Sequence, residues 1–233
     1  MFDYRPEGIQ NPSNHCYLNS ILQILCRVLV TVNADLYFKD NDEAKLVQLL
    51  MDIISKRSDR TLTGFKVELR KYNHFFDGSI QRDAVECFNL LLDLIHEGTK
   101  KNLIDMDGSM LENDDFVTSL SKELFAFTLM KTMTCENCNR KTDTFIPGYN
   151  LDIYPDSDDS IINLLDKSMS SIVTKSCTSC MSDTNHTEIL QLSQTPKFLT
   201  IIVNRFDFYI TAMKKDTEIV INPIELFRVL LCF

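Results

Sequence analysis

The sequence has little of several features that mark large classes of protein. No window holds the roughly 18 uninterrupted apolar residues that a membrane-spanning helix needs, and no internal repeat or low-complexity tract is present. Basic residues are the minority, with 24 Lys and Arg against 33 Asp and Glu and a net charge of −9. The basic face that nucleic-acid-binding proteins carry is therefore missing. These absences argue against a membrane span in this chain and against nucleic acid as its partner.

A secretory signal is also missing. Residues 1–14 carry Asp3, Arg5 and Glu7 without an apolar centre, so no signal peptide is expected. The chain has 8 cysteines, and in a reducing compartment such thiols serve as metal ligands more often than they form disulfides. We therefore expect a cytoplasmic or nuclear protein, or one found in both places. A content of 44% hydrophobic residues is enough for a packed core.

Hydrophobic periodicity changes along the chain. Its first half predicts helices from Cys16 onward, capped by Ser13 or Asn14, and over 42–55 and 79–97, the last with Gly98 at the stop position. A polar loop is expected over 100–115. The second half predicts strands over 125–133, 149–153, 188–192 and 198–208. One short helix is expected among them, over 160–168. This order predicts an α+β fold with spatially separate lobes.

Two cysteine pairs of identical spacing lie in the β-rich half. They are Cys135 with Cys138 and Cys177 with Cys180. The CxxC spacing lets two thiolates reach one ion from a tight turn, and two such turns complete the tetrahedral geometry of structural zinc. Four unrelated buried cysteines or a redox pair are the alternatives, although neither pair begins a helix after a strand. The pattern predicts a structural zinc site with all four positions filled by protein.

A different chemistry is predicted for Cys16. It lies in the first turn of an apolar-striped helix, where unpaired backbone N–H groups and the helix dipole favour a thiolate. The same N–H groups can bind a developing oxyanion, and Asn11 and Asn14 can add amide donors. The alternative is a small buried apolar residue, which is how Cys26 and Cys87 fit their helix stripes.

The surrounding run resembles a known family. Residues 8–23 resemble the cysteine box of ubiquitin-specific proteases, G-L-x-N-x-G-N-T-C-Y-L-N-S-x-L-Q, and depart from it at Ser13 and His15. Residues 81–88 resemble the family's Q-Q-D-A-x-E-F box, and residues 195–206 resemble its L-P-x-x-L … L-K-R-F strand. These elements follow the family's order over nearly the whole chain.

The resemblance implies a fold, a reaction and a set of roles. The fold is the papain-like, α+β ubiquitin-specific protease fold, with a helical thumb over 1–115, zinc-ribbon β fingers over 116–194 and an incomplete β palm over 195–233. The reaction is hydrolysis of the bond after the C-terminal glycine of ubiquitin through a thioester, and the partner is ubiquitin or a ubiquitinated protein. The implied nucleophile is Cys16, and the implied oxyanion donor is the side chain of Asn11. The residues implied to support the cleft are Asn14, Gln81, Asp83 and Glu86. The implied zinc ligands are Cys135, Cys138, Cys177 and Cys180.

One required part is not found in the sequence. A cysteine nucleophile needs an imidazole base and an orienting carboxylate or amide, which the family carries in a G-H-Y-type box of the late palm. None of the 4 histidines lies in such a box. His74 and His186 are expected in loops and His96 on an exposed helix face. The chain is then a truncated protease or a pseudoenzyme that binds ubiquitin without cutting it. A zinc-ribbon interaction protein with an inert Cys16 is the third hypothesis. An incomplete palm also predicts an unpaired strand edge.

Overall fold

The computed structural model describes residues 8–9, 11, 14–29, 31–32, 42–56, 59–76, 80–102, 117–207, 213–221 and 229–232. The chain divides into two compact units, Met1–Glu123 and Leu124–Phe233. Ser13, most of the predicted loop over 100–115, and Phe208 at the end of a predicted strand lie outside the described residues. Within the described ranges no helix is long and apolar enough to cross a membrane.

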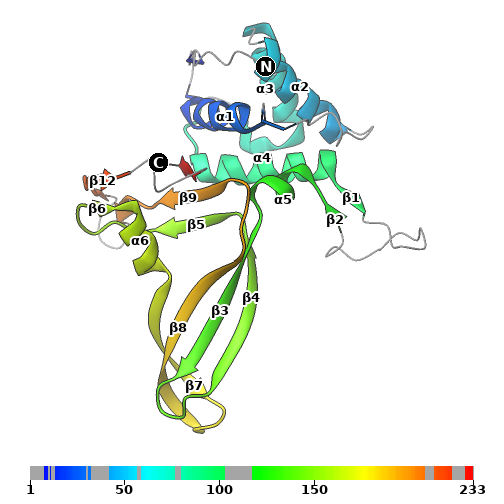
Figure 1. The fold of residues 1–233 in the computed structure, drawn as a ribbon. Coiled ribbons are helices and arrows are strands. Elements are labelled where there is room, and N and C mark those ends of the chain that lie inside the picture. The colour runs from blue at the N-terminus through cyan, green and yellow to red at the C-terminus, as the bar shows by residue number, and fades with distance from the viewer. Residues whose placement is uncertain are drawn as a thin grey trace. The chain divides into compact units, whose positions relative to one another are not determined.

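The first unit is built from helices (Figure 1). Helices α1 and α2 both pack on α4, and α3 packs on α2. The buried stripes that the sequence predicts for α1 and α4 form this core, with Leu22 and Leu25 of α1 and Phe88 and Leu91 of α4 fully buried. The elements are α1 (Cys16–Leu29), α2 (Asp42–Lys56), α3 (Asp59–Tyr72), the 3-10 helix η2 (His74–Phe76), α4 (Ala84–Thr99), the two-stranded pair β1 (Lys101–Asn102) and β2 (Val117–Thr118), and α5 (Leu120–Phe125), which crosses into the second unit.

The predicted helices are confirmed with changed ends. The helix predicted over 79–97 begins only at Ala84, because Asp83 caps it and residues 80–83 are not helical. Gly98 does not stop it: the helix continues through Thr99, and the Lys100 N–H donates to the carbonyl of His96 at 2.7 Å. Helix α3 was not predicted, because its face offers few buried apolar side chains besides Phe65 and Leu69.

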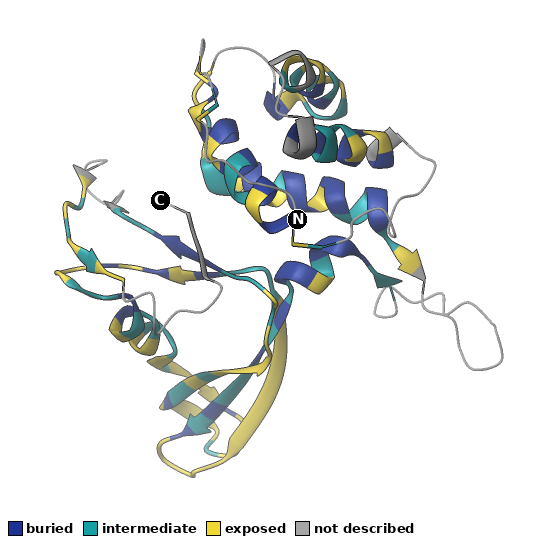
Figure 2. Ribbon diagram, turned by 45° about the horizontal axis from the view of Figure 1, so that its top comes forward, coloured by how far each residue is buried: buried dark blue, intermediate teal, exposed yellow. Residues whose placement is uncertain are grey.

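An antiparallel sheet of four strands dominates the second unit, in the order β4-β3-β8-β7 (Figure 1). The strands are β3 (Phe127–Cys135), β4 (Lys141–Gly148), β7 (Ser170–Cys177) and β8 (Ser182–Gln194). The predictions over 125–133 and 188–192 therefore found β3 and the middle of β8. Strand β4 is exposed over 141–147 (Figure 2) and β7 is mostly exposed, so neither shows the one-sided apolar pattern from which a strand is predicted.

A second sheet is parallel, in the order β13-β9-β5. It contains β5 (Asn150–Ile153), β9 (Leu199–Val203) and β13 (Val229–Cys232). The strand predicted over 198–208 is divided, because residues 204–205 separate β9 from β10 (Phe206–Asp207), which pairs with β11 (Met213–Lys214). The core beside this sheet joins both β5 and β9 to the short helix, through Ile153, Ile161, Leu164, Ile201 and Val203.

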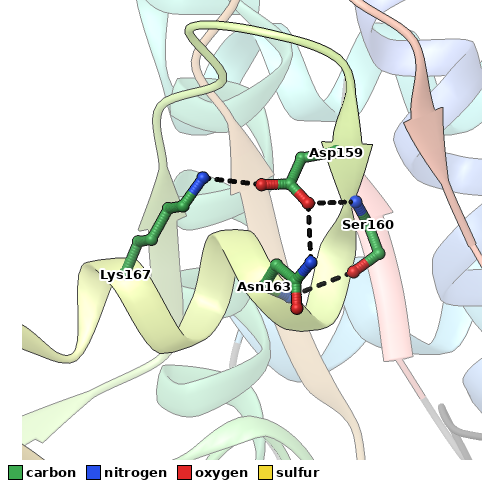
Figure 3. Close-up of polar contacts among 4 residues, drawn as sticks. All are labelled: Asp159, Ser160, Asn163 and Lys167. Atoms are coloured by element: carbon green, nitrogen blue, oxygen red, sulfur yellow. Dashed lines mark hydrogen bonds and ion pairs between the residues drawn. The ribbon is translucent and has the colours of Figure 1, made fainter.

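The short helix α6 (Ile161–Ser168) is confirmed, and a polar network fixes its start (Figure 3). Ser160 is the N-cap, with its hydroxyl accepting from the Asn163 N–H at 3.2 Å. The Asp159 carboxylate accepts from Lys167 at 2.6 Å and from the Asn163 amide and the Ser160 N–H at 2.8 Å each. These donors, Lys167 first, lower the pKa of Asp159 to about 2. Strand β6 (Asp159–Ser160) pairs in parallel with β12 (Ile219–Val220).

Candidate functional site

Cys16 is the first residue of α1, and its side chain is exposed. The carbonyl of His15 accepts the first bond of the helix, from the Asn19 N–H at 2.9 Å. The backbone N–H groups of the first turn consequently point out of the helix end, because no carbonyl precedes them. Cys87 is the opposite case: it is fully buried, and burial raises the pKa of its thiol to about 12. Cys26 is also buried. Cys16 is therefore the thiol of this unit that solvent reaches.

Asn11 is joined to the start of α1. Its side-chain Oδ1 accepts a hydrogen bond from the His15 N–H at 3.1 Å, and the residue is exposed. That bond leaves the NH2 group as the donor end of the Asn11 amide, close to the helix start in sequence and in space. Asn14 is exposed and lies in the bend just before the helix. The predicted oxyanion role of Asn11 is compatible with this geometry and stays a prediction.

Three of the four residues predicted to support the cleft lie around the start of α4, and the fourth is Asn14. Asp83 is its N-cap, and one carboxylate oxygen accepts from the Val85 N–H at 2.7 Å and from the Glu86 N–H at 2.9 Å. Gln81 precedes the cap and Glu86 lies in the first turn, both with exposed side chains. The structure thus gives Asp83 a capping function, and the support of a cleft stays a prediction for all three.

An aromatic contact chain links the two sequence boxes, and sequence analysis missed it. The ring of Tyr17, next to Cys16, packs edge-on against Phe75, with ring centroids 5.7 Å apart and an interplanar angle of 89°. The guanidinium carbon of Arg82 lies 5.3 Å from the centroid of the same Phe75 ring, within range of a cation–π interaction. Phe75 thereby contacts the residue after the proposed nucleophile and the residue before the α4 cap. Two adjacent phenylalanines between the boxes were the available signal.

The four cysteines of the two CxxC pairs converge, as predicted. Their Sγ atoms all lie within 4.8 Å of one another. Cys135 and Cys180 approach to 3.8 Å and Cys138 and Cys177 to 3.7 Å, so each close pair joins the two knuckles. Four thiolates bound tetrahedrally at about 2.3 Å from zinc lie roughly 3.8 Å apart. The donor set and its spacing fit a zinc ion, and the alternative of four unrelated cysteines is wrong.

The two knuckles have the same backbone form. The Asn139 N–H donates to the carbonyl of Cys135 and the Met181 N–H to that of Cys177, both at 2.9 Å. Asn139 and Met181 both have positive φ, at 57° and 54°, which is uncommon for residues other than glycine. A hydrogen bond from the Thr184 side chain, and next one from the Cys138 N–H, lower the pKa of Cys135 to about 5, whereas the hydrogen bond with the Cys138 side chain, and next burial, raise the pKa of Cys180 to about 12.

The histidines take other positions than expected. His186 is not in a loop: it lies in β8, buried, with Nδ1 3.0 Å from the carbonyl oxygen of Thr184. His96 is half-buried, and its Nδ1 lies 2.8 Å from the Ser119 hydroxyl. Burial, and next the charge of Lys122, lower the pKa of His96. His74 is exposed in the 3-10 helix η2, and His15 is buried.

Comparisons with known proteins place the whole chain. A profile of the ubiquitin carboxyl-terminal hydrolase family matches residues 7–229. The chain is 26% identical to ubiquitin carboxyl-terminal hydrolase 12 of Salmo salar, with 94% of the chain aligned, and 23% identical to ubiquitin carboxyl-terminal hydrolase Usp2 of Drosophila melanogaster, with 85% aligned. It spans 66% and 24% of the lengths of these two relatives.

Solved structures share the fold. The SAGA Ubp8/Sgf11/Sus1/Sgf73 DUB module bound to ubiquitin aldehyde matches with a TM-score of 0.71 and 19% identity, over 92% of this chain and 51% of that chain. A structure of the module bound to monoubiquitin matches with a TM-score of 0.72 and 18% identity, over 92% of this chain and 52% of that chain. The family profile over residues 7–229 shows that the chain belongs to the ubiquitin carboxyl-terminal hydrolase family, in its ubiquitin-specific protease group, and the solved structures show that it shares their α+β fold.

Proposed function

We propose that the chain forms part of a cysteine deubiquitinase, which hydrolyses the bond after the C-terminal glycine of ubiquitin. The observation that carries the proposal is the exposed thiol of Cys16 at the start of α1, with Asn11 bonded to the same helix start. The family membership supplies the reaction class. The structures of a related module with ubiquitin bound support ubiquitin or a ubiquitinated protein as the partner.

The proposed chemistry begins at Cys16. Its thiolate attacks the carbonyl carbon of the C-terminal glycine of ubiquitin. The carbonyl oxygen becomes an oxyanion, which accepts hydrogen bonds from the N–H groups of the first turn of α1 and from the Asn11 amide. The tetrahedral intermediate expels the amine with a proton, and water then hydrolyses the thioester. Both steps need a proton carrier. A bond at Nδ1 leaves Nε2 of an imidazole able to take a proton, but the described contacts of His96 and His186 are to Ser119 and Thr184 and not to Cys16, so we assign the base to neither. We expect the 233-residue chain alone to turn over poorly.

The remaining assignments follow the family resemblance. We propose that residues 1–115 form the thumb, 116–194 the fingers and 195–233 the first part of the palm, with Asn14, Gln81, Asp83 and Glu86 supporting the cleft. We also propose that the four clustered cysteines bind zinc. A metal with four protein ligands has no open position, so its role is structural. Such thiolates persist in reducing compartments, which supports residence in the cytoplasm or nucleus.

A ubiquitin probe with a C-terminal electrophile tests the proposed nucleophile. The probe should label the wild-type chain covalently, and Cys16→Ala should abolish the adduct. Cys26→Ala is the matched control, because Cys26 lies in the same helix but is buried, and it should be labelled like wild type. Equal labelling of the Cys16→Ala protein would show that another residue reacts, and the assignment of Cys16 would then be wrong.

The placement of His96 and His186 favours a second candidate function, in which the chain binds ubiquitin without cleaving it. Titration with ubiquitin, followed by NMR or calorimetry, separates the two. Saturable binding with no cleavage of a ubiquitin–fluorophore substrate supports the binding module. Cleavage that depends on Cys16 supports the enzyme, and absence of both binding and cleavage contradicts both functions.

A further inference from the structure

Side chains beyond the four cysteines surround the candidate metal centre. This inference rests on the proposed zinc site. Four thiolates around one divalent ion leave a net negative charge, which nearby hydrogen-bond donors stabilise. Two such donors come from residues that belong to neither CxxC pair as ligands: Thr184 of β8 and Asn137 of the first knuckle.

Thr184 contacts the first ligand of the first knuckle. Its Oγ1 lies 3.2 Å from the Sγ of Cys135. Thr184 pairs across the sheet with Lys175 of β7, so two regular strands hold its position. A thiolate can only accept, and the hydroxyl is then the donor. The contact is therefore suited to the deprotonated, metal-binding form of Cys135.

Asn137 and Arg140 reach from the first knuckle to the second. The Asn137 side-chain NH2 donates to the Sγ of Cys180 at 3.4 Å. The Arg140 guanidinium donates to the hydroxyls of Ser179 and Thr178, at 2.8 Å and 3.3 Å. One turn thus supplies a donor to a sulfur of the other turn and a cation beside it. Because these contacts join the two knuckles, they order the two turns relative to each other and not only within one turn.

We propose that Thr184 and Asn137 are outer-shell donors that raise the zinc affinity of the four-cysteine site, and that Arg140 positions the second knuckle for binding. Hydrogen bonds to bound thiolates reduce their charge and orient them toward the ion. Loss of such an outer-shell partner commonly lowers metal affinity by about 10–100-fold. Thr184 and Asn137 act directly on sulfur, whereas Arg140 acts through the turn, so its loss should have the smallest effect.

Competition with a chromophoric chelator measures the zinc affinity of the purified full chain loaded with zinc. Thr184→Val keeps the shape of the side chain and removes its hydroxyl, and Asn137→Ala removes the amide donor. Each single variant should weaken zinc binding by about tenfold or more. Thr184→Ser restores the donor and should recover most of the affinity. Thr187→Val is the matched control, because Thr187 lies on the same strand and donates to Glu136 of the knuckle at 3.1 Å rather than to a sulfur. It should change affinity by less than about twofold.

Cobalt substitution adds a readout that altered folding would not mimic. Removing a donor to a bound thiolate should move the sulfur-to-cobalt charge-transfer band of the Thr184→Val protein to longer wavelength, while Thr187→Val leaves it unchanged. The outer-shell assignment alone would be overturned if the wild type binds one equivalent of zinc and the zinc affinities of Thr184→Val and Asn137→Ala both lie within twofold of the wild-type affinity. Wild type that binds no zinc would overturn the proposed metal as well.

Discussion

The helical unit and the four-stranded sheet are stabilised in different ways. Helices α1 and α4 bury continuous apolar stripes, and Leu22, Leu25, Phe88 and Leu91 have no exposed surface. In the sheet, β4 is exposed over 141–147 and β7 is exposed except at Val173 and Cys177. At its knuckle end four cysteines converge. A small lobe with little core requires another source of stability, and the proposed metal site would supply one.

Removal of the metal should separate the two regions most clearly. Strong chelators or Cys177→Ser should unfold the knuckle end, because the apparent free energy of structural zinc binding is on the order of 10 kcal/mol in small zinc domains. Hydrogen exchange should then rise by orders of magnitude in β7 and β8 and change little in α1 and α4. Equal loss of protection in both regions would show that the helical core also depends on the cysteine cluster.

Truncation of the helical core should give the reverse pattern. Phe88→Ala deletes a fully buried ring of α4 and should lower the free energy of unfolding of the first unit by about 3–5 kcal/mol. Chemical denaturation monitored by circular dichroism measures the loss. Val67→Ala, at a side chain with 45% exposure in α3, should change it by less than about 0.5 kcal/mol. Zinc content should stay at the wild-type value in both variants, and its loss would contradict the separation.

The cap of α4 should have a smaller effect. Asp83→Ala removes the acceptor for two backbone N–H groups and should cost about 1 kcal/mol. Asp83→Asn keeps a good cap and should restore most of that stability. If Asp83 also supports the proposed cleft, Asp83→Asn will bind ubiquitin more weakly than wild type at matched stability. Binding equal to wild type would leave Asp83 with the capping role alone.

The smallest effect concerns pH. Burial lowers the pKa of His96 below its usual 6.5, so the unfolded chain binds the proton more readily than the folded one. The stability that depends on neutral His96 is present above about pH 6.5 and is lost as pH falls below that value. His96→Gln should flatten this part of the curve for the helical unit, measured by denaturation between pH 7 and 5. Lys122→Gln, which removes the second cause, should reduce the slope by less. An unchanged slope in His96→Gln would assign the dependence to other groups.

Local pattern determined much of this protein. The apolar stripes after Cys16 and over 84–97 and the matched CxxC pairs each depend on residues close in sequence, so these two helices and the set of candidate ligands were predictable. The start of α4 at the Asp83 cap was not predicted. Strands β4 and β7 and helix α3 were missed, because their side chains are mostly exposed or carry few apolar positions. Their neighbours in sequence hold them: β4 pairs with β3, β7 pairs with β8, and α3 packs on α2.

Only the tertiary structure decided whether the Cys16 thiol is exposed. The sequence placed Cys16, Cys26 and Cys87 all in helices, with burial expected for the last two, and the fold exposed Cys16 and buried Cys26 and Cys87. It also brought Cys135 and Cys180 to 3.8 Å although 44 residues separate them, placed Phe75 against both Tyr17 and Arg82, and aimed Thr184 and Asn137 at sulfur. Exposure and donors from other segments set the reactivity of a thiol, and both arise only when distant parts of the chain pack together.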